Sequence, residues 1–464
     1  MAKKQKNDIE LIEYSMVIIG AGQTGMSLAK MLMRYDVKIL LLDEMEPGIK
    51  SSLDIKLFTF LANKYKGIET KKFLSLLSDE MEQAKVEANE PFNKKILEGS
   101  TVDFLKGKPK VLSNNTIEVN GQTFKFKKLI FATGSYYKDL VMPGLTPSMY
   151  IDPGEIGMLE PFVETVAIYG SDWAALELGQ ALTKVGIKVY FVDSNVNPFD
   201  DFDDEVEATL KKQFKNDLMS WCLETTVVNH EVTSDTTIRI TLKTDSIERS
   251  IEVNKIITTK KSPNTLSVEA PFELHKNKSG AFIISSSFQM KEKNNFYAIG
   301  DVNGLHLYPN QGYHQAFTLA QNFLEKLSKL DVYNFAFSLN VDPSISFYGM
   351  NKSQIEYSQM PYNEFMYEFK NDFKVKSKGE LGRIKVFTNH KHEILGALLI
   401  GDELSELINV FVVAKQNNIK FHKLAWLNIP FFTKSEFIRD AALEYYHEFI
   451  LKDKQLKTKT KKFK

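Results

Sequence analysis

The chain has 464 residues, with 59 lysine and arginine residues against 59 aspartate and glutamate residues, so its formal net charge is zero. This balance gives no global reason to expect a nucleic acid or an anionic membrane as the main partner. Cys222 is the single cysteine of the sequence, which excludes an intrachain disulfide framework, a CxxC redox pair and a thiolate-rich metal cluster. We expect no metal site.

The sequence also predicts the cellular location of the protein. No stretch approaches the roughly 18 apolar residues of a membrane helix, and the charged start has no apolar signal region, so we expect a cytoplasmic protein without membrane insertion. The end, from Lys452 to Lys464, holds seven lysines and one acid. It is typical of a solvated tail, and weak contact with RNA or an acidic partner is the alternative.

Residues 15–44 predict a complete βαβ unit. The apolar run 16–19 predicts a buried strand, because parallel strands covered on both faces lose their alternating pattern. A helical pattern runs from 26 to 35, and a second apolar strand, 37–42, ends at Asp43.

A GxGxxG motif lies between this strand and this helix. Gly20 allows a tight turn, Gly22 lets the backbone approach a pyrophosphate, and Gly25 lets the helix pack closely on the strand. The helix N-terminus offers N–H groups and partial positive charge to phosphates, and Asp43 can accept hydrogen bonds from a ribose. Together they predict a dinucleotide site.

The next segments predict helices and then strands. Residues 46–92 have an amphipathic helical pattern, and residues 97–130 read as short strands with a hairpin turn at Asn120-Gly121. A buried strand then ends in Ala132, Thr133 and Gly134.

A second βαβ unit begins near Val166, but its phosphate loop is degraded. Gly170 is retained, whereas Asp172 and Ala175 occupy the second and third glycine positions. Asp193 stands 18 residues beyond the third position, as Asp43 does in the first unit.

The rest of the sequence predicts further strands and helices, the last of which form a separate C-terminal part. Strands are predicted through 226–259 and a loop at 260–265, and an apolar strand then leads to Gly300-Asp301. A helix is predicted from about 312 to 330, and the part from about 341 onward alternates strands and helices, which is typical of an α+β domain.

This order of motifs resembles the pyridine nucleotide-disulfide oxidoreductase family. The resemblance lies in the first GxGxxG with Asp43, the ATG segment at 132–134, the second motif with Glu177, SPN within 260–265, AIGDV at 298–302 and the C-terminal VDPSISFYG. It implies an α/β fold with two Rossmann-like βαβ nucleotide-binding domains and a C-terminal α+β dimerisation domain.

The resemblance also implies domains, cofactors and partners. The FAD-binding domain would comprise 1–150 and 281–335, the NAD-binding-like domain 151–280, and the dimerisation domain 341–464, and the protein would be a homodimer. FAD would bind the first motif, with Asp301 near its ribityl chain or pyrophosphate, and a nicotinamide nucleotide would bind the second. The residues expected to bind these nucleotides are Gly20, Gly22, Gly25, Asp43, Ala132, Thr133, Gly134, Gly300 and Asp301, together with Gly170 and Asp193.

Two departures from the family concern dithiol chemistry. Ser51 and Ser52 stand where a redox cysteine is expected, and an oxygen cannot form a disulfide or a thiolate. Phe431 replaces the acid–base histidine, although its partner Glu436 is retained. We therefore expect no dithiol or disulfide reduction by the family mechanism.

A third departure concerns the nicotinamide site. Asp172 places a negative charge where pyrophosphate would lie, and two like charges 4 Å apart repel by roughly 1 kcal/mol in water and about 4 kcal/mol at an effective dielectric near 20. Asp193 favours NADH over NADPH. Glu177 is retained, and the resemblance implies that it pairs with a lysine near the flavin. Lys56 and Lys64 are both candidates for that lysine.

These observations lead to two hypotheses. The first is an FAD-dependent oxidoreductase without a redox disulfide, NADH-linked through a weakened site, with oxygen, a quinone or another small acceptor. The second is a catalytically degenerate paralogue that binds FAD structurally and acts as a partner subunit. No catalytic residue is assigned beyond the retained Glu177 and Glu436.

Overall fold

A computed structural model describes residues 11–49, 52–137, 149–194, 206, 208, 210, 212, 214, 217–265, 269–305, 308, 310–324, 335–368, 382–401 and 404–451. The lysine-rich tail, Ser51 and residues 325–330 of a predicted helix lie outside them. Contacts divide the chain into a first unit, Met1–Phe58, Lys71–Pro161 and Ile257–Asp331, and a second unit, Thr59–Thr70, Phe162–Ile256 and Val332–Lys464. The four domain boundaries expected from the sequence stay a prediction.

The first unit is built around a mixed sheet. Its elements are β1 (Glu13–Ile19), α1 (Gln23–Leu32), β2 (Ile39–Asp43), the start of α2 (Ser52–Lys64), nearly all of α3 (Thr70–Asn89), β3 (Val102–Lys106), β4 (Pro109–Val111), β5 (Thr116–Val119), β6 (Gln122–Phe131), β7 (Ser135–Tyr137), β8 (Tyr150–Ile151), β16 (Lys261–Pro263), β17 (Phe296–Ala298) and α6 (Gln311–Leu324).

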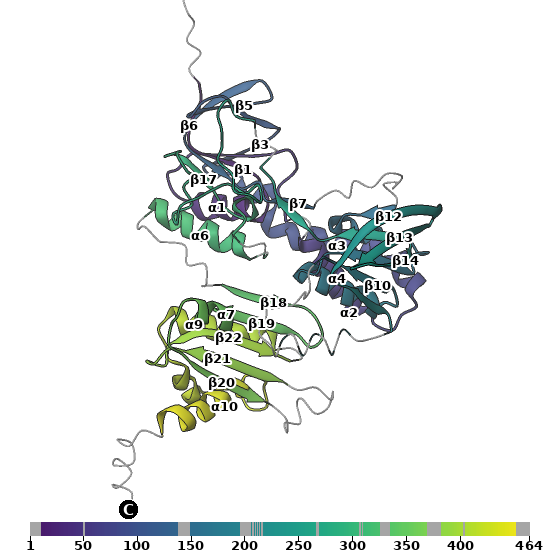
Figure 1. Ribbon diagram of the computed structural model, residues 1–464. Coiled ribbons are helices and arrows are strands. Elements are labelled where there is room, and N and C mark those ends of the chain that lie inside the picture. Colours follow the sequence, from purple (N-terminus) through teal and green to yellow (C-terminus); the bar gives the residue numbers. More distant parts are fainter. Residues whose placement is uncertain are drawn as a thin grey trace, which may run out of the picture. The chain divides into compact units, whose positions relative to one another are not determined.

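Seven described strands form this sheet in the order β3-β2-β1-β6-β5-β4, with β17 beside β6 (Figure 1). β1 pairs in parallel with β2 and with β6, and β17 pairs in parallel with β6. Apolar side chains of β1, β2 and β6 are almost entirely buried. The predicted βαβ unit and its buried strands are therefore confirmed.

Two local predictions can be compared with the structure in detail. Asn120 and Gly121 both have positive φ, 52° and 79°, and join antiparallel β5 to β6, which confirms the hairpin turn. The helix predicted at 26–35 is wrong by three residues at each end, since α1 spans Gln23–Leu32. Gly25 therefore lies inside the first turn of α1, where its missing Cβ permits close packing.

The second unit contains the second βαβ unit and the C-terminal part. Its elements are β9 (Thr165–Tyr169), α4 (Trp173–Lys184), β10 (Lys188–Val192), β11 (Met219–Cys222), β12 (Thr225–Ser234), β13 (Thr237–Thr244), β14 (Ile247–Val253), the start of β15 (Lys255–Thr258), β18 (Ala336–Leu339), β19 (Ile345–Gly349), α7 (Lys352–Tyr357), β20 (Asn363–Glu368), β21 (Arg383–Thr388), β22 (Ile394–Ile400), α9 (Ile408–Gln416) and α10 (Glu436–Tyr445).

Both predicted parts of this unit are confirmed. β10 pairs in parallel with β9 and with β11, so α4 connects two parallel strands. The C-terminal part has a five-stranded sheet in the order β18-β19-β22-β21-β20, accompanied by helices (Figure 1). Its core includes Phe411, Phe421 and Tyr445, each fully buried. The fold class is thus α/β with a C-terminal α+β part, as predicted.

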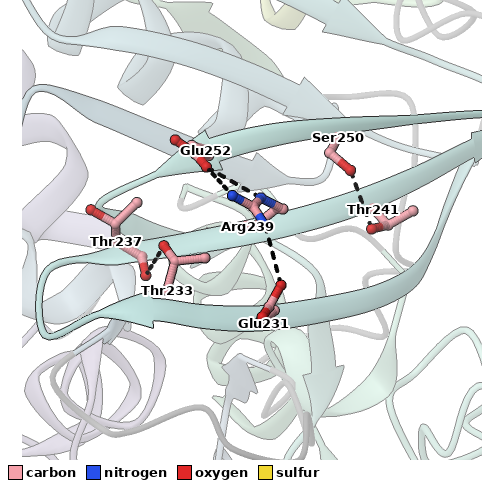
Figure 2. A network of polar contacts seen from close by, with 7 residues as sticks. All are labelled: Glu231, Thr233, Thr237, Arg239, Thr241, Ser250 and Glu252. Carbon is pink, nitrogen blue, oxygen red and sulfur yellow. Dashed lines mark hydrogen bonds and ion pairs between the residues drawn. The ribbon is translucent and has the colours of Figure 1, made fainter.

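A charged ladder runs across the three-stranded antiparallel sheet β12-β13-β14 (Figure 2). Arg239 on β13 lies opposite Glu231 on β12 and Glu252 on β14. Its guanidinium donates to Glu252 at 2.9 Å and to Glu231 at 3.3 Å. These acids raise the pKa of Arg239, the hydrogen bond to Glu252 contributing most. The exposed ladder therefore joins three strands by one shared cation.

The loop predicted at 260–265 is only partly right. Residues 261–263 form β16, which pairs antiparallel with β7, more than 120 residues earlier in the chain. Such a long-range pairing leaves no periodic signal in a three-residue strand. In the part of the chain that the structure describes, every helix is too short or too polar to cross a bilayer.

The charged ladder leads to a stability prediction. Changing Arg239 to glutamate places three acids side by side, and like charges opposite one another destabilise a sheet. We expect R239E to lower Tm by a few degrees at low salt, with most of the loss recovered in about 1 M salt, because exposed charges are screened. R239Q, the neutral control, should show a smaller loss that salt does not change. Thermal unfolding measures both, and a salt-independent loss in R239E contradicts the prediction.

Candidate functional site

The predicted site residues of the first unit converge at one edge of its sheet. Gly20 follows β1, Asp43 ends β2, Ala132 follows β6, and Gly300-Asp301 lie just beyond β17. These four strands are neighbours and parallel, so their carboxyl ends meet at the same edge. Ligands of doubly wound α/β sheets bind at this edge. Residues separated by up to 281 positions in the sequence are therefore brought together.

A cavity of about 440 Å³ opens at this edge. Seven of the predicted FAD-binding residues line it, and Gly25 and Gly300 support it from the adjoining turns. The lining also contains Ser52, the first residue of α2. The cavity is lined by Ile19, Gly20, Gly22, Gln23, Thr24, Asp43, Glu44, Met45, Ile49, Ser52, Pro109, Ala132, Thr133, Gly134, Ser135, Lys261, Asn264, Asp301 and Gly312.

The three motif glycines do different work. Gly20 has a φ of 109°, which favours glycine, and a Cβ there would overlap Ala132 O. A Cβ on Gly25 would overlap the carbonyl oxygen of Gly20, so this position must be glycine for α1 to pack on the turn. At Gly22 the nearest atom to such a Cβ is Gly48 O at 3.9 Å. A Cβ on Gly22 would thus make only an ordinary van der Waals contact, so this position leaves room beside the cavity for a phosphate.

Asp43 shapes the phosphate loop. Its Oδ2 accepts a hydrogen bond from the Ala21 N–H at 2.7 Å, and its Oδ1 accepts one from the Met45 N–H at 2.9 Å. The carboxylate remains partly accessible and lines the cavity. It can thus hold the loop and still face a ribose.

Asp301 follows β17, which lies on the other side of β1 and β6 from the strand that ends in Asp43. Its Oδ2 accepts the Ser135 hydroxyl at 2.6 Å, which fixes the direction of the carboxylate. Thr133 Oγ1 donates to Asn264 O at 2.5 Å, so the 132–134 segment is tied to the turn after β16. Sequence reasoning missed Ser135, because its partner lies more than 130 residues away, and it marked Asn264 only as part of the SPN segment, without its contact to Thr133.

These features fit FAD. Gly22 precedes α1 and has no side chain that could accept from the first-turn N–H groups, so these donors stay uncapped in a segment, Gly22 to Thr24, that lines the cavity. A ribose partner, Asp43, and a second carboxylate, Asp301, line the same space. The residues can therefore hold the pyrophosphate and polar chain of a dinucleotide.

The second βαβ unit has a different helix N-terminus. Asp172 is the N-cap of α4, and its Oδ1 accepts the Ala175 N–H at 3.0 Å. The carboxylate thus takes one of the donors that would otherwise bind phosphate, in addition to bringing a negative charge. The charge expected from the sequence is present at this position, and it is also hydrogen-bonded to the helix.

Asp193 is placed differently from Asp43. It is 4% exposed, and its Oδ2 accepts the buried hydroxyl of Ser171 at 2.9 Å. Gly170, with a φ of 136°, makes the turn between β9 and α4. Gly170 and Asp193 therefore occupy the ends of parallel strands as expected, but the carboxylate is engaged within the fold.

Glu177 is fully buried and binds the C-terminal segment of its own unit. Its Oε1 accepts the Asn340 N–H at 2.6 Å. One turn later, Gln180 accepts from the Asp342 N–H at 2.8 Å and donates to the Asp342 carbonyl at 3.1 Å. α4 is thus tied to the 340–342 segment by buried polar bonds.

The remaining candidate groups are not arranged for thiol chemistry. Phe431 is 89% exposed, and Glu436 forms an ion pair with Arg439 at 3.6 Å. Cys222 is buried at the end of β11, and burial raises the pKa of its thiol, which disfavours the reactive thiolate. Among the described residues, no three histidine, cysteine, aspartate or glutamate side chains gather in a metal-binding cluster.

The glycine geometry separates binding from folding. We expect Gly22→Ala to leave the Tm of the apoprotein nearly unchanged but to lower FAD occupancy at least tenfold, because the methyl group enters the cavity. Gly25→Ala should lower the Tm of the apoprotein itself, because its methyl group meets backbone. Thermal unfolding without FAD and flavin content after purification measure these effects. A destabilised Gly22→Ala apoprotein with full FAD occupancy contradicts this assignment.

Comparisons with known proteins agree with this architecture. Family models described as Pyridine nucleotide-disulphide oxidoreductase and its dimerisation domain match residues 14–322 and 337–442. A mercuric reductase of Staphylococcus aureus is 22% identical, covering 93% of this chain and 82% of its own length, and a dihydrolipoyl dehydrogenase of Mycoplasma genitalium is 21% identical, covering 92% and 98%.

Solved structures show the same fold at low identity. LpdA from Mycobacterium tuberculosis has a TM-score of 0.81 at 18% identity, covering 94% of this chain and all of its own. The HOCl-induced flavoprotein disulfide reductase RclA from Escherichia coli has a TM-score of 0.79 at 18% identity, covering 93% of this chain and all of its own. Because the family models match most of the sequence, the chain belongs to the FAD-binding pyridine nucleotide-disulphide oxidoreductase family.

Proposed function

We propose that this protein is an FAD-dependent oxidoreductase that transfers electrons from the flavin directly to a small acceptor such as oxygen or a quinone. The observation that carries the proposal is the cavity of the first unit, which combines an open helix N-terminus with Asp43, Asp301 and Ser52. Bound FAD supplies the redox chemistry of such a site. The serine hydroxyl supplies polarity at the cavity and takes no part in electron transfer.

The protein's own groups would bind and orient the cofactor. The N–H groups at the start of α1 would bind the pyrophosphate, and Asp43 would accept from the adenosine ribose. Asp301, held by Ser135, would accept from the ribityl chain. The direct route to a small acceptor follows from the single buried cysteine, because no thiol relay can be assembled from this chain.

NADH is the proposed electron donor, bound with reduced affinity. Asp172 supports the reduced affinity, because its carboxylate both repels pyrophosphate and takes the Ala175 N–H. Homodimer formation is also proposed, on the match of residues 337–442 to the family's dimerisation domain.

A second candidate is a subunit that binds FAD for structure alone. Three observations favour it: Asp172 caps α4, Ser171 donates to the buried Asp193, and Glu177 accepts from Asn340. Each engages a retained or altered nucleotide-site residue in a contact internal to the second unit. A cofactor that no longer turns over can still stabilise a fold by binding only the native state.

One anaerobic titration separates the two candidates. Purified holoprotein is mixed with NADH and then NADPH while the visible absorbance of the flavin is followed. Bleaching by NADH within seconds supports the oxidoreductase and excludes the structural role. An unbleached flavin at millimolar nucleotide overturns the NADH-linked function and supports the structural role.

Asp172 has its own matched pair of variants. Asparagine is an equally good N-cap without the charge, so Asp172→Asn isolates electrostatic repulsion. Asp172→Gly also removes the side chain from the helix N-terminus. We expect NADH affinity to rise about tenfold in Asp172→Asn and further in Asp172→Gly, because the repulsion is worth between roughly 1 and 4 kcal/mol.

Calorimetric titration of the holoproteins with NADH measures these affinities. FAD content serves as the control and should not change, since Asp172 lies in the other unit. Equal or weaker NADH binding in both variants contradicts the role given to the carboxylate.

A further inference from the structure

A buried polar network supports the turn that presents Asp301. The Gly300 N–H and the Asn303 side-chain amide both donate to Gln315 Oε1, at 2.8 Å and 2.7 Å. Asn303 also donates to Ala298 O at 3.2 Å, at the end of β17. Gln315 is fully buried and Asn303 is 3% exposed. One side-chain oxygen on α6 thus joins the strand end, the turn and the helix.

The orientation of the Gln315 amide is fixed by these two donors. Because its oxygen accepts both hydrogen bonds, its nitrogen points away from the turn, and it has no hydrogen-bond partner within the described part of the chain. A buried, unsatisfied donor is unfavourable, and an apolar side chain of similar size would avoid that cost. The two hydrogen bonds that Gln315 Oε1 accepts therefore offset the cost of burying the amide nitrogen without a partner.

The turn itself depends on this support. Gly300 has a φ of 80°, in the left-handed region, and its N–H would be buried without an acceptor if Gln315 were apolar. Asp301 follows directly, and Ser135 holds its carboxylate from the other side at 2.6 Å. The backbone of the turn and the side chain that it presents are thus fixed by two separate contacts.

We propose that Gln315 is a positioning residue for FAD, which sets the place of Asp301 through the Gly300 N–H without lining the cavity itself. The inference rests on the proposed role of Asp301 in cofactor binding and names the residue that makes this role possible. Hydrogen bonds that lock a ligand-binding group in place reduce the ordering cost of binding.

The test compares FAD binding by three buried-glutamine variants. In Gln315→Met the acceptor is lost while the size is kept, and we expect the Kd for FAD to rise at least tenfold. Gln315→Glu keeps an oxygen that can accept from Gly300 and Asn303, so its Kd should return to within about threefold of the unmodified protein. Gln180→Met removes another buried amide, 7% exposed, from the second unit, and it should lower Tm without changing the Kd.

Kd is measured by flavin fluorescence on adding FAD to protein stripped of cofactor, and visible circular dichroism of the holoproteins reports the flavin environment. We expect the flavin dichroism of Gln315→Met to change shape, whereas that of Gln180→Met should match the unmodified protein. A Gln315→Met protein with unmodified Kd and dichroism overturns the inference. Equal weakening in the methionine and glutamate variants of Gln315 also overturns it, because the acceptor would then be irrelevant.

An Asp301→Asn variant keeps this failure distinct from failure of the proposed site. If Asp301→Asn binds FAD as tightly as the unmodified protein, the role of Asp301 fails, and the inference fails with it. If Asp301→Asn weakens binding while Gln315→Met does not, only the positioning role of Gln315 is overturned.

Discussion

The free N–H groups at a helix N-terminus can be satisfied by a side chain of the protein or by a bound anion, and this competition distinguishes the two βαβ units. In the first unit, Gly22 precedes α1 and leaves the donors without a side-chain cap at the edge of the cavity. In the second unit, Asp172 caps α4 with a carboxylate. The same local architecture thus has two different electrostatic outcomes. One change of residue type at the corresponding position accounts for the difference.

The acid at the end of the second strand also has different surroundings in the two βαβ units. Asp43 binds the phosphate loop through backbone N–H groups and still reaches the cavity, whereas Asp193 is buried and accepts a hydrogen bond from the Ser171 hydroxyl. Glu177 accepts a hydrogen bond from the Asn340 N–H in the 340–342 segment. The first unit therefore retains the features of a dinucleotide site, and polar groups of the second unit are engaged in its own packing. A family fold that usually couples two nucleotides supports, in our proposal, one strong site and one weakened site.

Much of this arrangement could be predicted from sequence, because its signals are local. The glycine spacing, apolar strand runs and terminal acids predicted both βαβ units, and the parallel pairing then brought Gly20, Asp43, Ala132 and Asp301 to one edge. Sequence also revealed the charge at Asp172. It could not reveal that this carboxylate binds Ala175 N, or that Asp193 is buried, since both depend on side-chain direction. The pairing of β16 with β7 and the support of Gly300 by Gln315 are long-range contacts without a motif.

Titration of FAD-saturated protein with ADP-ribose in a calorimeter measures directly whether the second nucleotide site still accepts a pyrophosphate. ADP-ribose contains the adenosine and pyrophosphate of NADH but has no redox activity, so the measurement reports only the second nucleotide site. Because Asp172 occupies the α4 N-terminus, we expect binding no tighter than the millimolar range. Stoichiometric binding at micromolar affinity would contradict it, since a second helix N-terminus would then accept a pyrophosphate despite its carboxylate cap.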